Sequence, residues 1–175
     1  MPVREGQVLG RRGLARLARG SAGLGAVLLL AAGCGGGATA MPAEEAVEHH
    51  ELVAEELLAA ADSVRPLSWQ RRSQEIIEPG AEDCRYQPGV WEADEPLYPE
   101  PGQGMDWEPW RAALDPVLEE HGFEALGREQ SSGGDLWLEA EGPHGSRLLV
   151  HADGVMRLTD VLVDADPCED TTLGL

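Results

Sequence analysis

Short runs of alternating apolar and polar residues fill the last third of the chain, and they restrict its fold more than any other feature. The runs cover residues 123–128, 136–140, 147–151 and 155–163, with short polar or glycine-rich stretches between them. A period of two is typical of a strand with one buried face, and short connections make neighbouring strands antiparallel. The pattern predicts a four-stranded antiparallel meander that packs one face on helices.

The dipeptide Asp153-Gly154 separates the runs LLVHA and VMRLT. Asp-Gly between two alternating runs is a strong hairpin signal, because a type I′ turn needs positive φ at both central residues. We therefore expect a type I′ turn at Asp153-Gly154.

Residues 42–64 carry apolar side chains at helical spacing, with glutamates at many of the other positions. The apolar set is Val47, Val53, Ala54, Leu57, Leu58, Ala61 and Val64. Pro42 suits the first helical position, and Pro66 ends the run. The pattern predicts an amphipathic helix with one buried stripe, and it leaves open that the helix pairs with a partner protein.

A second helix is expected from Asp106 to Gly122. Asp106 is a good N-cap, and Met105 and Trp110 stand at the positions of a hydrophobic staple. Pro116 predicts a kink inside the helix. Gly122 and Phe123 suit a Schellman ending, in which the glycine is left-handed and the next residue folds back.

The region between the helices contains two stretches of strand character. Residues 74–78 and 85–92 are interrupted by expected turns at Pro79-Gly80 and Pro88-Gly89, and 95–104 reads as a proline-rich loop. The fold class predicted is α+β, with an N-terminal amphipathic helix, a short strand region, a second helix and the meander, in a single small domain at 42–175.

The N-terminus has the character of an export signal. Arginines precede an apolar run at residues 21–32, which is shorter than the roughly 20 residues that a membrane span requires. The favoured export path is the general secretory route, and Arg11-Arg12 leaves a twin-arginine route open.

The sequence LAAGC at residues 30–34 resembles the lipobox of bacterial lipoproteins. Leu30 lies one place further from the cysteine than that family prefers, with Ala31 in its position. The resemblance implies that residues 1–33 are cleaved, that Cys34 receives a diacylglyceryl group, and that residues 34–41 form a flexible tether. The protein is then anchored by lipid at the outer face of the cell membrane, because two acyl chains give stable anchoring.

With Cys34 assigned to lipidation, Cys84 and Cys168 remain. An even remainder of two in an exported protein predicts one disulfide, Cys84–Cys168. A redox or metal-binding pair is the alternative, but the chain has no CxxC spacing.

The formal net charge is −19, although residues 1–33 carry five arginines and one glutamate. The remaining chain is therefore more negative still. Such a charge argues against nucleic-acid partners, since phosphate backbones are bound by Lys and Arg. It also repels anionic lipid head groups.

Aromatic residues gather around the proline-rich loop. Trp91, Tyr98, Trp107 and Trp110 are candidate ligand-binding residues, because aromatic faces beside a loop can stack on a sugar or hold a proline-rich peptide. The alternative is that these side chains fill the core, since each indole buries around 200 Å².

No cofactor, metal site or catalytic residue is expected. His49-His50-Glu51 begins a HExxH motif, but Ala54 stands where the second zinc ligand is needed. The acidic residues around Cys168 lack the glycine of a calcium loop and read as a solvated edge, with weak divalent binding as the alternative. No nucleophile has an evident base.

Across the mature chain the sequence resembles the small lipoproteins of actinobacteria. The matching positions are Cys34, Cys84, Trp107, Trp110, Gly122, Phe123 and Cys168. The resemblance implies a membrane-anchored extracytoplasmic α+β domain and carries over no catalytic residue. We expect the domain to bind or modulate another cell-envelope component, with a cell-wall glycan or peptide module at Trp91–Trp110, or a small hydrolase, as alternatives.

Overall fold

The computed structural model describes residues 38–80, 83–98 and 104–173. Two α-helices and ten short strands make up the described part of the chain, with short 3₁₀ turns η1 (Pro143–Gly145) and η2 (Asp170–Leu173). The mixed α+β class predicted from the sequence is confirmed. The signal segment, Cys34 and the first part of the tether lie outside the described residues.

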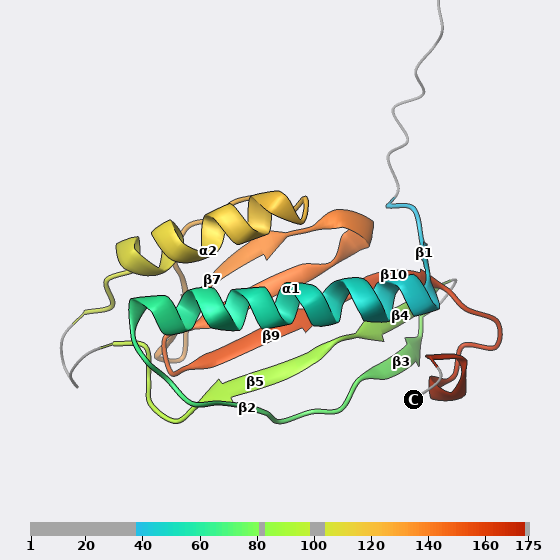
Figure 1. The fold of residues 1–175 in the computed structure, drawn as a ribbon, viewed down its shortest axis with the longest axis horizontal. Helices are drawn as coiled ribbons and strands as arrows, with labels where there is room; N and C mark the ends of the chain where they lie inside the picture. The colour runs from blue at the N-terminus through green and yellow to red at the C-terminus, as the bar shows by residue number, and fades with distance from the viewer. Residues whose placement is uncertain (1–37, 81–82, 99–103, 174–175) are drawn as a thin grey trace, which may run out of the picture. The chain divides into compact units, whose positions relative to one another are not determined.

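The strands form two sheets (Figure 1). The four-stranded sheet has the order β1 (Met41–Pro42), β10 (Val161–Asp164), β4 (Cys84–Gln87) and β3 (Ile76–Pro79). The six-stranded sheet has the order β2 (Trp69–Arg71), β5 (Gly89–Ala93), β9 (Val155–Thr159), β8 (Arg147–His151), β7 (Asp135–Glu141) and β6 (Gln130–Ser132). All neighbours are antiparallel except β1 and β10, which are parallel.

The chain passes from one sheet to the other several times, and two of these crossings correct the predicted single meander. The first crosses at Pro88, between β4 and β5. The second crosses at Asp160, which has φ of 66° and divides the run 155–163 into β9 and β10. The Asp160 N–H donates to the side chain of Gln87 at 3.2 Å, so it is satisfied away from the ladder.

The run at 123–128 is also not a strand, which is a second correction. Several of its backbone groups form hydrogen bonds with side chains of α2 (Glu108–Glu120) and not with a neighbouring strand. The guanidinium of Arg111 donates to the carbonyls of Leu126 and Gly127. The Leu126 N–H donates to Asp115 Oδ1 at 2.9 Å. Only two N–H groups of this segment, those of Glu124 and Gly127, reach carbonyls of β7.

The turn between β8 and β9 lies where the sequence predicts a hairpin, but it is not type I′. Among the described residues Gly154 has positive φ, at 94°, and Asp153 does not. The Gly154 N–H donates to the carbonyl of His151 at 3.1 Å, which places Ala152 and Asp153 at the centre of the turn. A left-handed glycine after such a turn is the usual three-residue hairpin loop.

Helix α1 (Ala43–Val64) begins one residue after the predicted start, because Pro42 is its N-cap and pairs in β1. Its first turns cover the four-stranded sheet: Ala43 and Ala46 pack with Tyr86, Val161 and other buried residues of that sheet. Its later turns cover the six-stranded sheet. Met41, which the sequence analysis assigned to the tether, is buried with Ala43 and Ala46 against the four-stranded sheet.

Helix α2 begins at Glu108, with Trp107 as N-cap. Asp106, the predicted N-cap, therefore lies one residue before the observed cap, although its Oδ1 still accepts the Glu108 N–H at 3.1 Å. The predicted Schellman ending is confirmed. Gly122 has φ of 78°, and the Phe123 N–H donates to the Leu118 carbonyl at 2.8 Å.

The larger hydrophobic core lies between the two helices and the six-stranded sheet. Its buried members come from both helices, from strands of this sheet and from the loops beside them. They include Val53, Leu57 and Ala61 of α1, Trp110, Leu114 and Leu118 of α2, and Leu138, Leu148, Val150, Met156 and Leu158 of the strands. No helix among the described residues is both long and apolar enough to span a bilayer.

Candidate functional site

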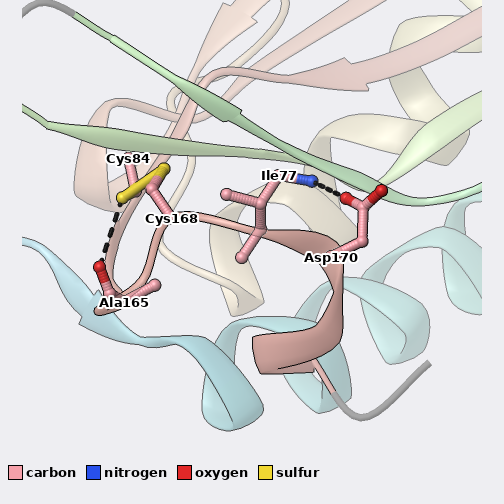
Figure 2. The surroundings of a disulfide bond; sticks show 5 residues. All are labelled: Ile77, Cys84, Ala165, Cys168 and Asp170. Carbon is pink, nitrogen blue, oxygen red and sulfur yellow. Dashed lines mark hydrogen bonds between the residues drawn. A yellow bond between two sulfur atoms is a disulfide. The ribbon is translucent and has the colours of Figure 1, made fainter.

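The predicted disulfide is present. Cys84, at the start of β4, is bonded to Cys168, which precedes η2, with 84 residues of sequence separation. The bond fastens the C-terminal segment to the four-stranded sheet, as Figure 2 shows. In the same view Asp170 Oδ1 accepts the backbone N–H of Ile77 at 2.8 Å, which adds a second tie from η2 to β3.

The aromatic residues predicted to bind a ligand lie mostly in the core. Trp91, Trp107 and Trp110 have 6, 7 and 4% of their surface exposed. The indole N–H of Trp107 donates to Glu129 Oε2 at 2.6 Å, and Tyr98 is half-buried against the same core. This burial favours the core alternative, because stacking on a sugar requires an accessible ring face.

A groove of about 570 Å³ runs beside helix α1. Its lining residues are Glu48, Glu51, Leu52, Ala54, Glu55, Leu58 and Trp91. Six of these come from one stretch of α1, at spacings of three, four and seven residues, which place side chains on adjoining faces of a helix. Trp91 of β5 contributes its accessible margin. We call this hollow the α1 groove.

One end of the α1 groove meets a network of charged side chains around Arg71. The guanidinium forms ion pairs with Glu51 and with Glu75, the latter at 2.9 Å, and its central carbon lies 4.9 Å from the ring centre of Trp91. Nη2 also donates to the Pro88 carbonyl at 2.8 Å. Arg71 is thus held by four groups, and its charge is matched by two carboxylates.

The network continues inward to Tyr86, which is fully buried. Its hydroxyl donates to Glu75 Oε2 at 3.1 Å. Burial, followed by the hydrogen bond with Glu51, raises the pKa of the Glu75 carboxyl above its ordinary value. Burial and the nearby Glu75 likewise raise the pKa of Tyr86. The raised pKa of Tyr86 keeps its hydroxyl neutral, so that it can donate its hydrogen bond to Glu75.

The remaining carboxylates of the groove are not matched in this way. Among the described residues no arginine or histidine forms an ion pair with Glu48 or Glu55. The α1 groove therefore combines an apolar floor with uncompensated negative charge on its rim.

A cluster of histidines, which no pattern in the sequence indicated, joins His49 and His50 of α1 to His121 at the end of α2. The ring centres of His49 and His121 are 5.4 Å apart, and those of His49 and His50 are 5.0 Å apart. His121 Nε2 lies 2.7 Å from Glu56 Oε2, which joins α2 to α1. Burial, and then His121 and His144, lower the pKa of His49.

His50 is fully buried, and its Nδ1–H donates to the Ala46 carbonyl at 2.8 Å. Its Nε2 has no hydrogen-bond partner among the described residues. Burial lowers the pKa of His50 to about 4, because protonation would place an unpaired charge in the interior. Across the described residues, no group of three or more His, Cys, Asp or Glu side chains is arranged to hold a metal ion.

A second hollow, of about 340 Å³, lies where the chain crosses between the sheets. Its lining contains Glu78, Arg157 and Asp160 together with several polar side chains. Asp160 lies 3.9 Å from Arg85 and 3.7 Å from Arg147. Both signs of charge are present, and the carboxylate of Asp160 already faces two guanidinium groups. The charges of this hollow therefore favour neither a cationic nor an anionic ligand, in contrast to those of the α1 groove.

Comparison of the chain with known protein families, curated proteins and solved structures finds no match.

Proposed function

We propose that the protein is a lipid-anchored, extracytoplasmic lipoprotein whose folded domain binds another component of the cell envelope and has no catalytic role. The observation that carries the proposal is the sequence LAAGC at residues 30–34, which follows a basic segment and a short apolar run. The thiol of Cys34 is the proposed acceptor of the lipid, and residues 1–33 are the proposed cleaved signal.

The disulfide supports export. Cystines persist in oxidising compartments and are rare where glutathione keeps thiols reduced. In the chain-entropy model, a loop of the size closed by Cys84 and Cys168 stabilises a fold by roughly 4 to 5 kcal/mol. Such a contribution would be lost in a reducing cytosol.

The charge supports a protein partner over a nucleic acid or a lipid surface. A net charge of −19 opposes binding to phosphate backbones and to anionic head groups. A tether before the domain would hold it away from a membrane of the same sign. The buried positions of Trp91, Trp107 and Trp110 speak against a glycan site built on these rings.

The proposal is tested by replacing Cys34. In cells fed a palmitate analogue, the wild-type protein is expected to incorporate the label and to fractionate with membranes. Cys34→Ala is expected to remain uncleaved or to be released, without label. The matched control is the double variant Cys84→Ser/Cys168→Ser, which keeps Cys34 and should keep its label. Unchanged labelling and fractionation of Cys34→Ala would contradict lipid anchoring.

A further inference from the structure

We propose that the α1 groove binds a basic polypeptide segment of another protein, in which Lys or Arg side chains flank an aliphatic anchor residue. The inference rests on the binding role proposed above and does not depend on the lipid anchor. It names the chemistry of the partner and the residues that recognise it.

The floor of the groove supplies a place for the aliphatic anchor. Leu52 is 47% exposed, which makes it the most exposed large apolar side chain among the described residues. Leu58 and the margin of Trp91 lie in the same lining. Covering a leucine side chain removes apolar surface from water and contributes to binding in proportion to that area.

The rim supplies the charge that selects a cation. Glu48, Glu51 and Glu55 follow one another at spacings of three and four residues on α1, where like charges repel and destabilise a helix. Arg71 is the cation that faces this region, and it is shared between Glu51 and Glu75. Glu48 and Glu55 are left for a partner, and a cationic segment would relieve their repulsion.

The same charge argues against other occupants. A second copy of the chain would bring a further net charge of −19 to an acidic groove. Nucleic acids and anionic lipids are opposed for the same reason. An uncharged ligand would leave Glu48 and Glu55 partly desolvated with no counterion, which costs free energy. A basic segment is the occupant that matches both the floor and the rim.

Binding is tested on the purified full chain with the synthetic peptide KRLLRRLK and its acidic counterpart EELLEELE. The basic peptide is expected to bind, and its affinity is expected to fall as ionic strength rises from about 0.01 to about 1 M, because the Debye length shrinks from about 30 to about 3 Å. Absence of binding by the basic peptide, or equal binding by the acidic one, would overturn the inference.

Variants locate the binding. Glu48→Gln/Glu55→Gln is expected to weaken the basic peptide about fivefold, the effect of two rim ion pairs, and Leu52→Ser about tenfold through lost apolar contact. The control Glu119→Gln/Glu120→Gln changes net charge by the same amount on exposed positions of α2 and should leave the affinity unchanged. Equal weakening by both double variants would mean that the peptide is attracted by the net charge of the protein and not by the groove, and it would contradict the inference. Circular dichroism verifies that each variant is folded.

A photoreactive residue at position 52 identifies the natural occupant in intact cells, with position 112 on α2 as control. The expected adduct at position 52 is a peptide with excess Lys and Arg around an aliphatic residue, absent from position 112. An adduct to a glycan, to a second copy of this chain, or to an acidic peptide would contradict the inference. Peptide binding in vitro with an unlabelled wild-type Cys34 would refute the anchor and leave the groove assignment standing.

Discussion

The phenolic oxygen of Tyr86 lies 3.1 Å from Glu75 Oε2, and this hydrogen bond connects strand β4 of the four-stranded sheet to the charged network around Arg71. Because Tyr86 is fully buried, its hydroxyl has no water to replace Glu75. Tyr86→Phe is therefore expected to lower the free energy of unfolding by about 1 to 2 kcal/mol.

The measurement is urea denaturation followed by tryptophan fluorescence. The chain has two tyrosines, so Tyr98→Phe is the matched control. Among the described residues nothing hydrogen-bonds the Tyr98 hydroxyl, and its removal should cost less than about 0.5 kcal/mol. Equal losses in the two variants would mean that the Tyr86–Glu75 bond contributes nothing of its own.

Removal of the disulfide should destabilise the domain strongly. Cys84→Ser/Cys168→Ser is expected to lower the free energy of unfolding by roughly 4 to 5 kcal/mol in the chain-entropy model, because the freed loop raises the entropy of the unfolded chain. Addition of a reductant to the wild-type protein should have the same effect. Cys34→Ala should unfold like the wild type in either condition. A wild-type unfolding curve that reductant does not move would contradict a stabilising bond.

Acid should destabilise the domain through His50. The folded pKa of about 4 lies below the ordinary value of 6.5, so the neutral form is favoured in the folded protein. The stabilisation is complete above about pH 6.5 and is lost as the pH falls through about 4. The shift corresponds to about 3 kcal/mol. Burial is the largest cause of the lowered pKa, the hydrogen bond to the Ala46 carbonyl raises it, and the neighbouring His49, His144 and His121 lower it further.

The variant His50→Leu should show a smaller loss of stability between about pH 6.5 and pH 4 than the wild type, measured by urea denaturation at each pH. Glu75 has the opposite effect on stability, because its raised pKa favours the folded state at low pH. His50→Leu retains Glu75, so the difference between this variant and the wild type isolates the contribution of His50. As a control, His151→Gln replaces a histidine of strand β8 and should leave the effect of His50 on the pH dependence in place. Parallel curves for wild type and His50→Leu would exclude His50 as the source.

The stability of the domain should depend on the backbone preference of the residue at position 160 more than on its charge. Its φ of 66° lies in the left-handed region, which Asn and Asp adopt more readily than other residues that have a Cβ. Its half-exposed carboxylate is 3.7 Å or more from its two arginines, so the ion pairs are worth little. Asp160→Asn should cost less than about 0.5 kcal/mol, and Asp160→Ala about 1 to 2 kcal/mol.

Both variants remove the same charge, so their difference in urea denaturation measures the backbone preference together with the hydrogen bond that Thr159 Oγ1 donates to the Asp160 side chain at 2.6 Å, which Ala cannot accept. Identical losses for Asn and Ala would show that the left-handed conformation at this position carries no cost.

Local chemistry accounts for what could be predicted from the sequence. The Schellman ending at Gly122 and Phe123 depends on residues within one helical turn, and it is present as expected. The α1 stripe follows from periodicity, and the pairing of Cys84 with Cys168 follows once Cys34 is set aside. Each of these depends on a few neighbouring residues or on simple counting.

The two failures among the strand runs involve groups that are distant in sequence. The alternating run 123–128 is not a strand because Arg111 and Asp115 of α2 take its backbone groups. The run 155–163 is divided because β10 pairs with β4 while β9 pairs with β5. The pattern of residues within either run does not indicate which other element will form hydrogen bonds with its backbone.

The sequence by itself determined the α+β class, the two helices, three of the four alternating runs and the pairing of Cys84 with Cys168, because periodicity, capping and composition act over short stretches of chain. Only the tertiary structure decided that the strands divide into two sheets, that the tryptophans lie in the core, and that Glu48, Leu52 and Glu55 adjoin Trp91 in one groove. Side chains far apart in the sequence share a site only when long-range pairing and burial bring their elements together, and that free energy belongs to the whole fold.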